Sequence, residues 1–133
     1  MGQQSNDEQW RSVEAGNGRF SDGTFLAWNT YEAVDNTRVN VTQGTFRSAE
    51  AARKEMHKWL HTASRVVDPL KRDSSGERAV GLFTPESGGK YTAILVVKGA
   101  RLIWISSSSV KRAMQMERYL VQRSSAHAKN SIN

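Results

Sequence analysis

The stretch Tyr91-Thr-Ala-Ile-Leu-Val-Val-Lys-Gly-Ala-Arg-Leu-Ile-Trp-Ile-Ser106 indicates the kind of fold that this chain adopts. Two apolar runs of strand length flank the turn pair Gly99-Ala100, which predicts strands over residues 91–98 and 101–106. The apolar residues in each run are consecutive, so they point to both faces of a sheet. We therefore expect these strands near the middle of a sheet, with at least part of both faces covered.

The same signals predict further strands elsewhere in the chain. Residues 24–34 are rich in aromatic and β-branched side chains and follow the turn pair Asp22-Gly23. Residues 37–43 alternate apolar and polar side chains, which is typical of a strand with one wet face. Residues 78–83 give a fifth strand, and residues 9–14 are a candidate for a short sixth one.

Apolar residues at helical spacing predict two helices. The first begins after Ser48, a suitable N-cap, and Pro69 ends it, so that residues 68–77 form a polar connection. Its apolar stripe consists of Ala49, Ala52, Met56, Trp59, Leu60, Ala63 and Val67. The second helix begins after a run of serines and turns inward Val110, Ala113, Met114, Leu120 and Val121.

These elements predict one α+β domain over residues 9–123, in which an antiparallel sheet of five to six strands carries two helices packed on one face. Residues 1–8 and 124–133 are polar and are expected to be flexible tails. The hexamers 55–60 and 115–120 resemble each other, with Met, a large aromatic residue and Leu in the same order. If this similarity reflects a duplicated strand-strand-helix unit, the fold has a pseudo-twofold axis.

Composition excludes several kinds of chemistry. The chain has 133 residues and no cysteine, which excludes thiol catalysis, thiolate metal sites and disulfides. Neither a signal peptide nor a membrane span is predicted, because the start is polar and no apolar run approaches bilayer length. Residues 1–36 carry six acids and two bases, whereas the rest of the chain brings the total to +6. The basic part can attract an anionic partner or form an ordinary solvated surface.

Several segments resemble a family of small, uncharacterised bacterial domains that are often exported. They are Ser48-Ala-Glu-Ala-Ala, Ala63 with Arg65-Val66-Val67, Gly76-Glu-Arg-Ala-Val80 and Leu102-Ile-Trp-Ile-Ser-Ser107. The resemblance covers about residues 45–120 and implies an α+β domain. It also implies an extracytoplasmic location after removal of an export signal, with the cytoplasm as the alternative. It transfers no catalytic residue, ligand or partner to this chain.

The serine run before the last helix is the first candidate site. Ser107, Ser108 and Ser109 precede Lys111 and Arg112. Free backbone N–H groups at a helix start, hydroxyl groups and two cations can together bind phosphate or a carboxylate. The alternative is N-capping, for which a single serine is sufficient.

Three other features are weaker candidates. His57 and His61 share one flank of the first helix at a spacing that can bind zinc, but His127 lies in the predicted tail, so we expect no metal site. Glu117 lies on the apolar stripe, where we expect it either to reach solvent from the edge of the stripe or to pair with a base, rather than to act in acid–base catalysis. No nucleophile elbow, phosphate loop or dinucleotide motif is present, so neither a catalytic site nor a cofactor is predicted.

The sequence thus predicts a non-catalytic binding or interaction domain for a protein or a small anionic ligand. Trp59 and Trp104 are expected in the core, whereas Trp28 is a candidate for exposure. The alternative is a binder of nucleic acid or another polyanion, which would use the basic face of the last helix: Lys111, Arg112, Arg118 and Arg123. An exposed apolar patch or a cleft would favour the first function, and one continuous basic face would favour the second.

Overall fold

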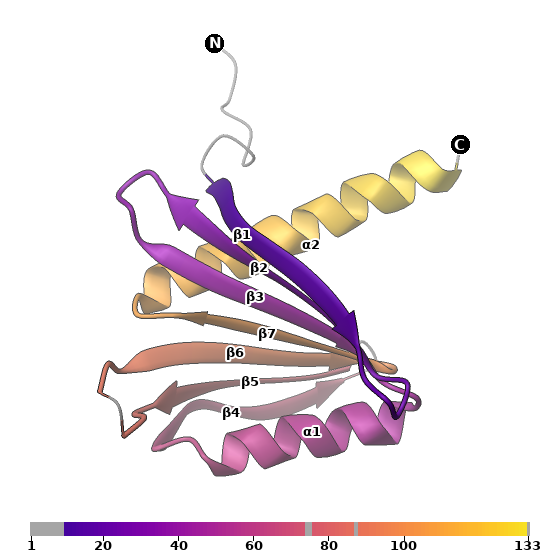
Figure 1. Ribbon diagram of the computed structural model, residues 1–133, viewed down its shortest axis with the longest axis horizontal. Helices are drawn as coiled ribbons and strands as arrows, with labels where there is room; N and C mark the ends of the chain where they lie inside the picture. The colour runs from indigo at the N-terminus through magenta and orange to yellow at the C-terminus, as the bar shows by residue number, and fades with distance from the viewer. Residues whose placement is uncertain (1–9, 74–75, 87, 133) are drawn as a thin grey trace.

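The computed structural model describes residues 10–73, 76–86 and 88–132, which form one sheet and two helices (Figure 1). In chain order the elements are β1 (Trp10–Arg19), β2 (Phe25–Ala33), β3 (Arg38–Thr45), α1 (Ala49–His61), β4 (Arg65–Asp73), β5 (Gly76–Phe83), β6 (Tyr91–Lys98), β7 (Arg101–Ser107) and α2 (Val110–Ile132). The predicted N-terminal tail, residues 1–8, lies outside the described residues. Within the described part, no helix combines the length and the apolar character needed to cross a membrane.

The sheet is antiparallel throughout, with strand order β1-β2-β3-β7-β6-β5-β4. Strands β1 to β3 form one meander and β4 to β7 form a second, which brings β7 beside β3 in the middle. The prediction of an α+β fold with an antiparallel sheet is confirmed, and so is the central position of the two apolar strands β6 and β7. The predicted number of strands, five to six, was too low, because the described residues form a sheet of seven strands.

The additional strand is β4, in a region where the sequence predicts the end of a helix and a polar connection. Helix α1 ends at His61, and from Ser64 the backbone pairs with β5, beginning with Ser64 N–H to the Leu82 carbonyl at 2.9 Å. Proline cannot donate to a neighbouring strand, but Pro69 lies on an edge strand where the pairing register shifts. Pro69 therefore interrupts the pairing of β4 without preventing the strand.

The predicted placement of both helices on one face is wrong. Residues Ala52 and Met56 of α1 pack in a cluster with Leu95, whereas α2 packs in a separate cluster with Ile94. Neighbouring residues of a strand point to opposite faces, so the two helices cover opposite faces. In Figure 1, α2 accordingly passes behind the sheet and α1 lies in front. The apolar run in β6 requires this arrangement, because both of its faces must be buried.

The internal duplication is not confirmed. A twofold axis that relates the antiparallel neighbours β3 and β7 would stand perpendicular to the sheet and would leave both helices on the same face. Instead, both helices contact β6 and β7, from opposite sides. As a result, α1 leaves part of its face of the sheet uncovered over β2 and β3.

Helix α2 is longer than predicted. It continues to Ile132 and so includes most of the segment 124–133 that the sequence assigns to a tail. The sequence from Ser108 onward contains neither glycine nor proline, so it holds no strong signal to end the helix.

Candidate functional site

A pocket of about 480 Å³ opens on the face of the sheet that α1 covers only in part. Its walls come from the β1–β2 turn, β2, β3, β6, β7 and α1, which are far apart in the sequence. Small-molecule sites in proteins typically have volumes of about 300–1,000 Å³ and are mostly apolar. The pocket therefore has the size of a small-molecule site.

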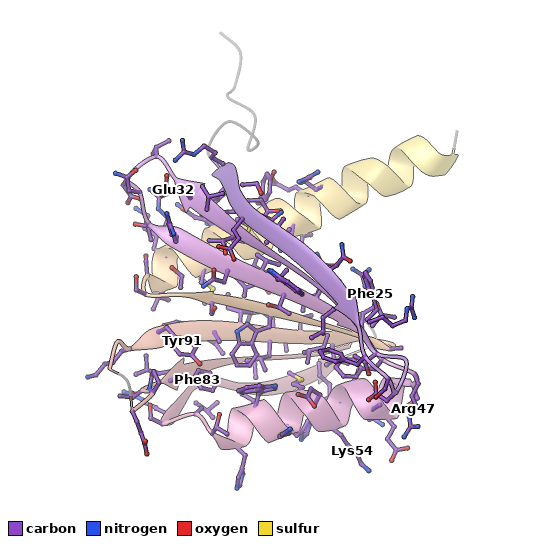
Figure 2. All side chains as sticks on the ribbon, viewed as in Figure 1. Phe25, Glu32, Arg47, Lys54, Phe83 and Tyr91 are labelled. Atoms are coloured by element: carbon purple, nitrogen blue, oxygen red, sulfur yellow. The ribbon has the colours of Figure 1, made fainter. Side chains whose placement is uncertain are left out.

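Most of the lining is aromatic or aliphatic. The apolar lining residues are Phe20, Leu26, Phe46, Trp59, Tyr91, Leu102 and Trp104. The rings of Trp59 and Trp104 meet edge to face, with centroids 5.1 Å apart, and Trp104 lies 5.4 Å from Phe83. Phe83 in turn stacks on Tyr91, with ring centroids 5.2 Å apart. Figure 2 shows these two residues next to each other. Four rings from α1, β5, β6 and β7 thus hold one another in place.

Glycine at position 44 makes room for this lining. On β3, Gly44 pairs with Leu26 on one side and with Leu102 on the other. A Cβ atom at Gly44 would lie 2.9 Å from Leu26 Cδ2 and 2.9 Å from Phe46 Cε1. Any larger residue would push these two side chains away from β3, and both of them line the pocket.

The β1–β2 turn fixes one rim of the pocket. Gly23 has a φ of +91°, which glycine adopts without strain. The Asp22 Oδ1 atom accepts the backbone N–H of Thr24 at 2.9 Å. This hydrogen bond, together with the hydroxyl group of Thr24, lowers the pKa of Asp22 below its ordinary value. The turn therefore presents an ionised carboxylate beside the exposed ring of Phe20.

The polar part of the lining is small and acidic. It consists of Asp22, Thr24, Thr42 and Glu55. Glu55 accepts the indole N–H of Trp59, four residues later on α1, at 2.8 Å. Among the described residues, two carboxylates and no lysine, arginine or histidine thus line the pocket, although the net charge of the chain is +6. The pocket combines aromatic surfaces with negative charge.

At the predicted anion site, the serines are engaged within the fold. Ser109 caps α2, because its Oγ accepts the Arg112 N–H at 3.2 Å. The Oγ of Ser107 donates to the Arg38 carbonyl at 2.9 Å and accepts the Ser109 N–H at 3.1 Å. The structure therefore shows the capping role, and Ser108 and Lys111 remain as exposed neighbours.

Two cations of the predicted polyanion face are also engaged. Arg112 lies 3.1 Å from Asp35 and 6.0 Å from the ring of Trp10. The pKa of Asp35 falls to about 2, first through the backbone and hydroxyl groups of Thr37 and then through Arg112. Arg123 packs over the ring of Tyr119 at 5.5 Å and donates to its hydroxyl group. Lys111 and Arg118 are exposed.

The weaker candidates do not meet in one site. His57 Nε2 lies 3.2 Å from Glu77, a buried carboxylate that also pairs with Arg53, whereas His61 is exposed. The side chain of His127 lies outside the described residues. Among the residues that are described, no three His, Cys, Asp or Glu side chains are grouped so that they could hold a metal ion.

Glu117 has the partner expected of a carboxylate on an apolar stripe. It accepts two hydrogen bonds from Arg78 of β5, at 2.7 and 2.8 Å. This bidentate pair joins α2 to the sheet. Glu117 is thus part of the packing between the helix and the sheet.

Reasoning from the sequence missed the pocket. It places Trp59 in the core, but 41% of this residue is exposed, and both Trp59 and Trp104 line the pocket. Two signals could have indicated the site: the i, i+4 pair of Glu55 and Trp59, and the isolated Gly44 inside a strand. No family model, curated protein or solved structure matches this chain.

Proposed function

We propose that this chain is a non-catalytic binding domain and that its ligand is a small organic molecule held in the aromatic pocket. The observation that carries the proposal is the pocket itself, about 480 Å³ in volume and open beside α1. The mutual contacts of Trp59, Trp104, Phe83 and Tyr91 support a preformed site, in which a ligand finds its surfaces already in place.

The polar groups of the pocket favour binding over catalysis. Asp22 accepts a backbone hydrogen bond and has a lowered pKa, which makes it a poor proton acceptor at neutral pH. Burial raises the pKa of Tyr91, so its phenol stays protonated. In the part of the chain that the structure describes, no histidine and no serine lines the pocket. These groups are suited to orienting a ligand by hydrogen bonds and charge.

Polyanion binding through α2 has less support. Arg112 already pairs with Asp35, and Arg123 packs on Tyr119, so two of the four proposed cations would have to leave partners within the fold. A small anionic ligand is also a poor match for the pocket, because the charged residues of the lining are acids. The charge distribution therefore favours the pocket and a ligand that is not an anion.

The test uses N-phenyl-1-naphthylamine, a neutral dye whose fluorescence rises in apolar surroundings. We expect saturable binding by the intact chain, and about tenfold weaker binding by the Trp59→Ala variant, because one wall of the pocket is lost. Trp28→Ala is the matched control, because Trp28 is also 41% exposed but does not belong to the lining. Phe20→Ala, at the exposed turn, gives a second variant with little expected effect on folding.

Two results would refute the proposal. One is dye fluorescence that rises without saturation. The other is equal weakening by Trp59→Ala and Trp28→Ala, which would indicate general surface adsorption. The thermal midpoint of each variant, followed by circular dichroism, distinguishes loss of the pocket from loss of the fold.

A further inference from the structure

We infer that the ligand of the aromatic pocket carries a positive charge and belongs to the class of small organic ammonium ions, an inference that rests on the proposed binding function. Both kinds of group that recognise such ions line the pocket. The aromatic groups include Trp59 and Trp104, and the anionic groups are Asp22 and Glu55.

The aromatic walls supply the first interaction. The face of an aromatic ring attracts a cation, and tryptophan does so most strongly. The ring centroids of Trp59 and Trp104 lie 5.1 Å apart with the ring planes at 65°, so their faces point in different directions, and both residues line the pocket. An alkylated ammonium group is weakly hydrated and can leave water for such a surface at low cost.

Glu55 supplies the second interaction. Its Oε2 accepts the Trp59 indole N–H at 2.8 Å, which places the carboxylate at the edge of the ring that would contact the cation. This hydrogen bond orients both groups before the ligand arrives. A cation bound over Trp59 would therefore also lie within reach of a negative charge.

Positive charges lie outside the lining. Arg47 contributes to the lowered pKa of Asp22, but it does not line the pocket and is exposed. In Figure 2, Arg47 lies near the right-hand end of the sheet, whereas Tyr91 lies near the left-hand end. Arg47 offsets part of the charge of Asp22, whereas Glu55 is hydrogen-bonded directly to Trp59, one of the aromatic walls. Glu55 is thus the residue on which the test should centre.

The experiment compares choline with 3,3-dimethylbutan-1-ol, a neutral molecule of the same shape, by calorimetric titration at low salt. We expect choline to bind about tenfold more tightly, because only choline interacts electrostatically with the rings and with Glu55. Glu55→Gln keeps an acceptor for the Trp59 indole N–H and removes the charge. This variant should lose most of the preference for choline, because choline binding weakens much more than binding of the alcohol.

The matched control is Glu50→Gln, which removes one acid from the same helix outside the lining. Equal binding of choline and the alcohol would overturn the inference and leave the proposed function standing. Equal loss of choline affinity in Glu50→Gln and Glu55→Gln would also overturn it, because the effect would then come from the overall charge. If the intact chain binds neither compound and also fails to bind the neutral dye, the proposed function fails as well.

Discussion

Gly44→Ala should change ligand binding more than stability. The added Cβ would lie 2.9 Å from Leu26 Cδ2 and from Phe46 Cε1. Since carbon atoms pack at about 3.5 Å or more, each side chain must move by roughly half an ångström. Both side chains line the pocket and would move into it. We therefore expect the affinity for N-phenyl-1-naphthylamine to fall about tenfold, as for other overpacked sites.

The expected change in stability is small because two effects oppose each other. Alanine is favoured over glycine inside a strand by about 0.5–1 kcal/mol. Displacing the ends of two flexible side chains costs a similar amount, so the net change in the free energy of unfolding should stay within about 1 kcal/mol. For a domain of this size that corresponds to a shift in the thermal midpoint of at most about 3–5 °C.

Gly18→Ala is the matched control for this prediction. Gly18 lies on β1 and pairs with Leu26, but a Cβ atom there would meet no atom within 4 Å. Dye titration and thermal unfolding of both variants provide the assay. The reasoning is refuted if Gly44→Ala binds the dye as tightly as the parent chain, or if Gly18→Ala weakens binding as much as Gly44→Ala does.

Three further predictions concern the layers of the fold and its charges. Met56→Ala and Met116→Ala should each lower the free energy of unfolding by about 2–5 kcal/mol. Because the two helices lie on opposite faces, a double-mutant cycle in denaturant should find the two effects additive within about 0.5 kcal/mol, and strong coupling would contradict this. Glu117→Ala should destabilise the protein by about 1–3 kcal/mol in urea by depriving Arg78 of its bidentate partner, and an unchanged midpoint would contradict this role. Asp35 has a pKa of about 2, below its ordinary value of 3.8, so its stabilising effect should be complete above pH 4 and disappear as the pH falls through 2. The difference in thermal midpoint between Asp35→Asn and the parent chain should therefore decrease over this pH range, and a difference independent of pH would contradict the prediction.

Local patterns predicted much of the fold. Consecutive apolar residues identified β6 and β7 as central strands, and the turn pair Asp22-Gly23 marked the start of a strand. Local periodicity shows that each helix has an apolar face, but it does not show which face of the sheet that helix covers. The decisive clue was present in the run Ala93–Val97, whose apolar side chains need cover on both faces.

Strand β4 and the pocket were missed for different reasons. The apolar stripe of α1 continues past its last turn through Ala63, and Pro69 was interpreted as the end of a helix rather than as a residue of an edge strand. The pocket depends on tertiary structure, because its lining comes from the β1–β2 turn, four strands and α1, which are far apart in the sequence. No single segment contains enough of its lining to reveal it. A tryptophan at helical spacing looks the same in the sequence whether it faces a core or the wall of a pocket.

The most direct test of the pocket follows the four indole N–H signals by NMR during titration with N-phenyl-1-naphthylamine. The account predicts large shifts for Trp59 and Trp104, with backbone amide shifts at Leu26 and Gly44, because these residues line the pocket. It predicts little change for Trp10, which packs on the α2 side of the sheet. Shifts confined to the outer face of α2, or no saturable shift of Trp59, would contradict the claim that this pocket is the binding site.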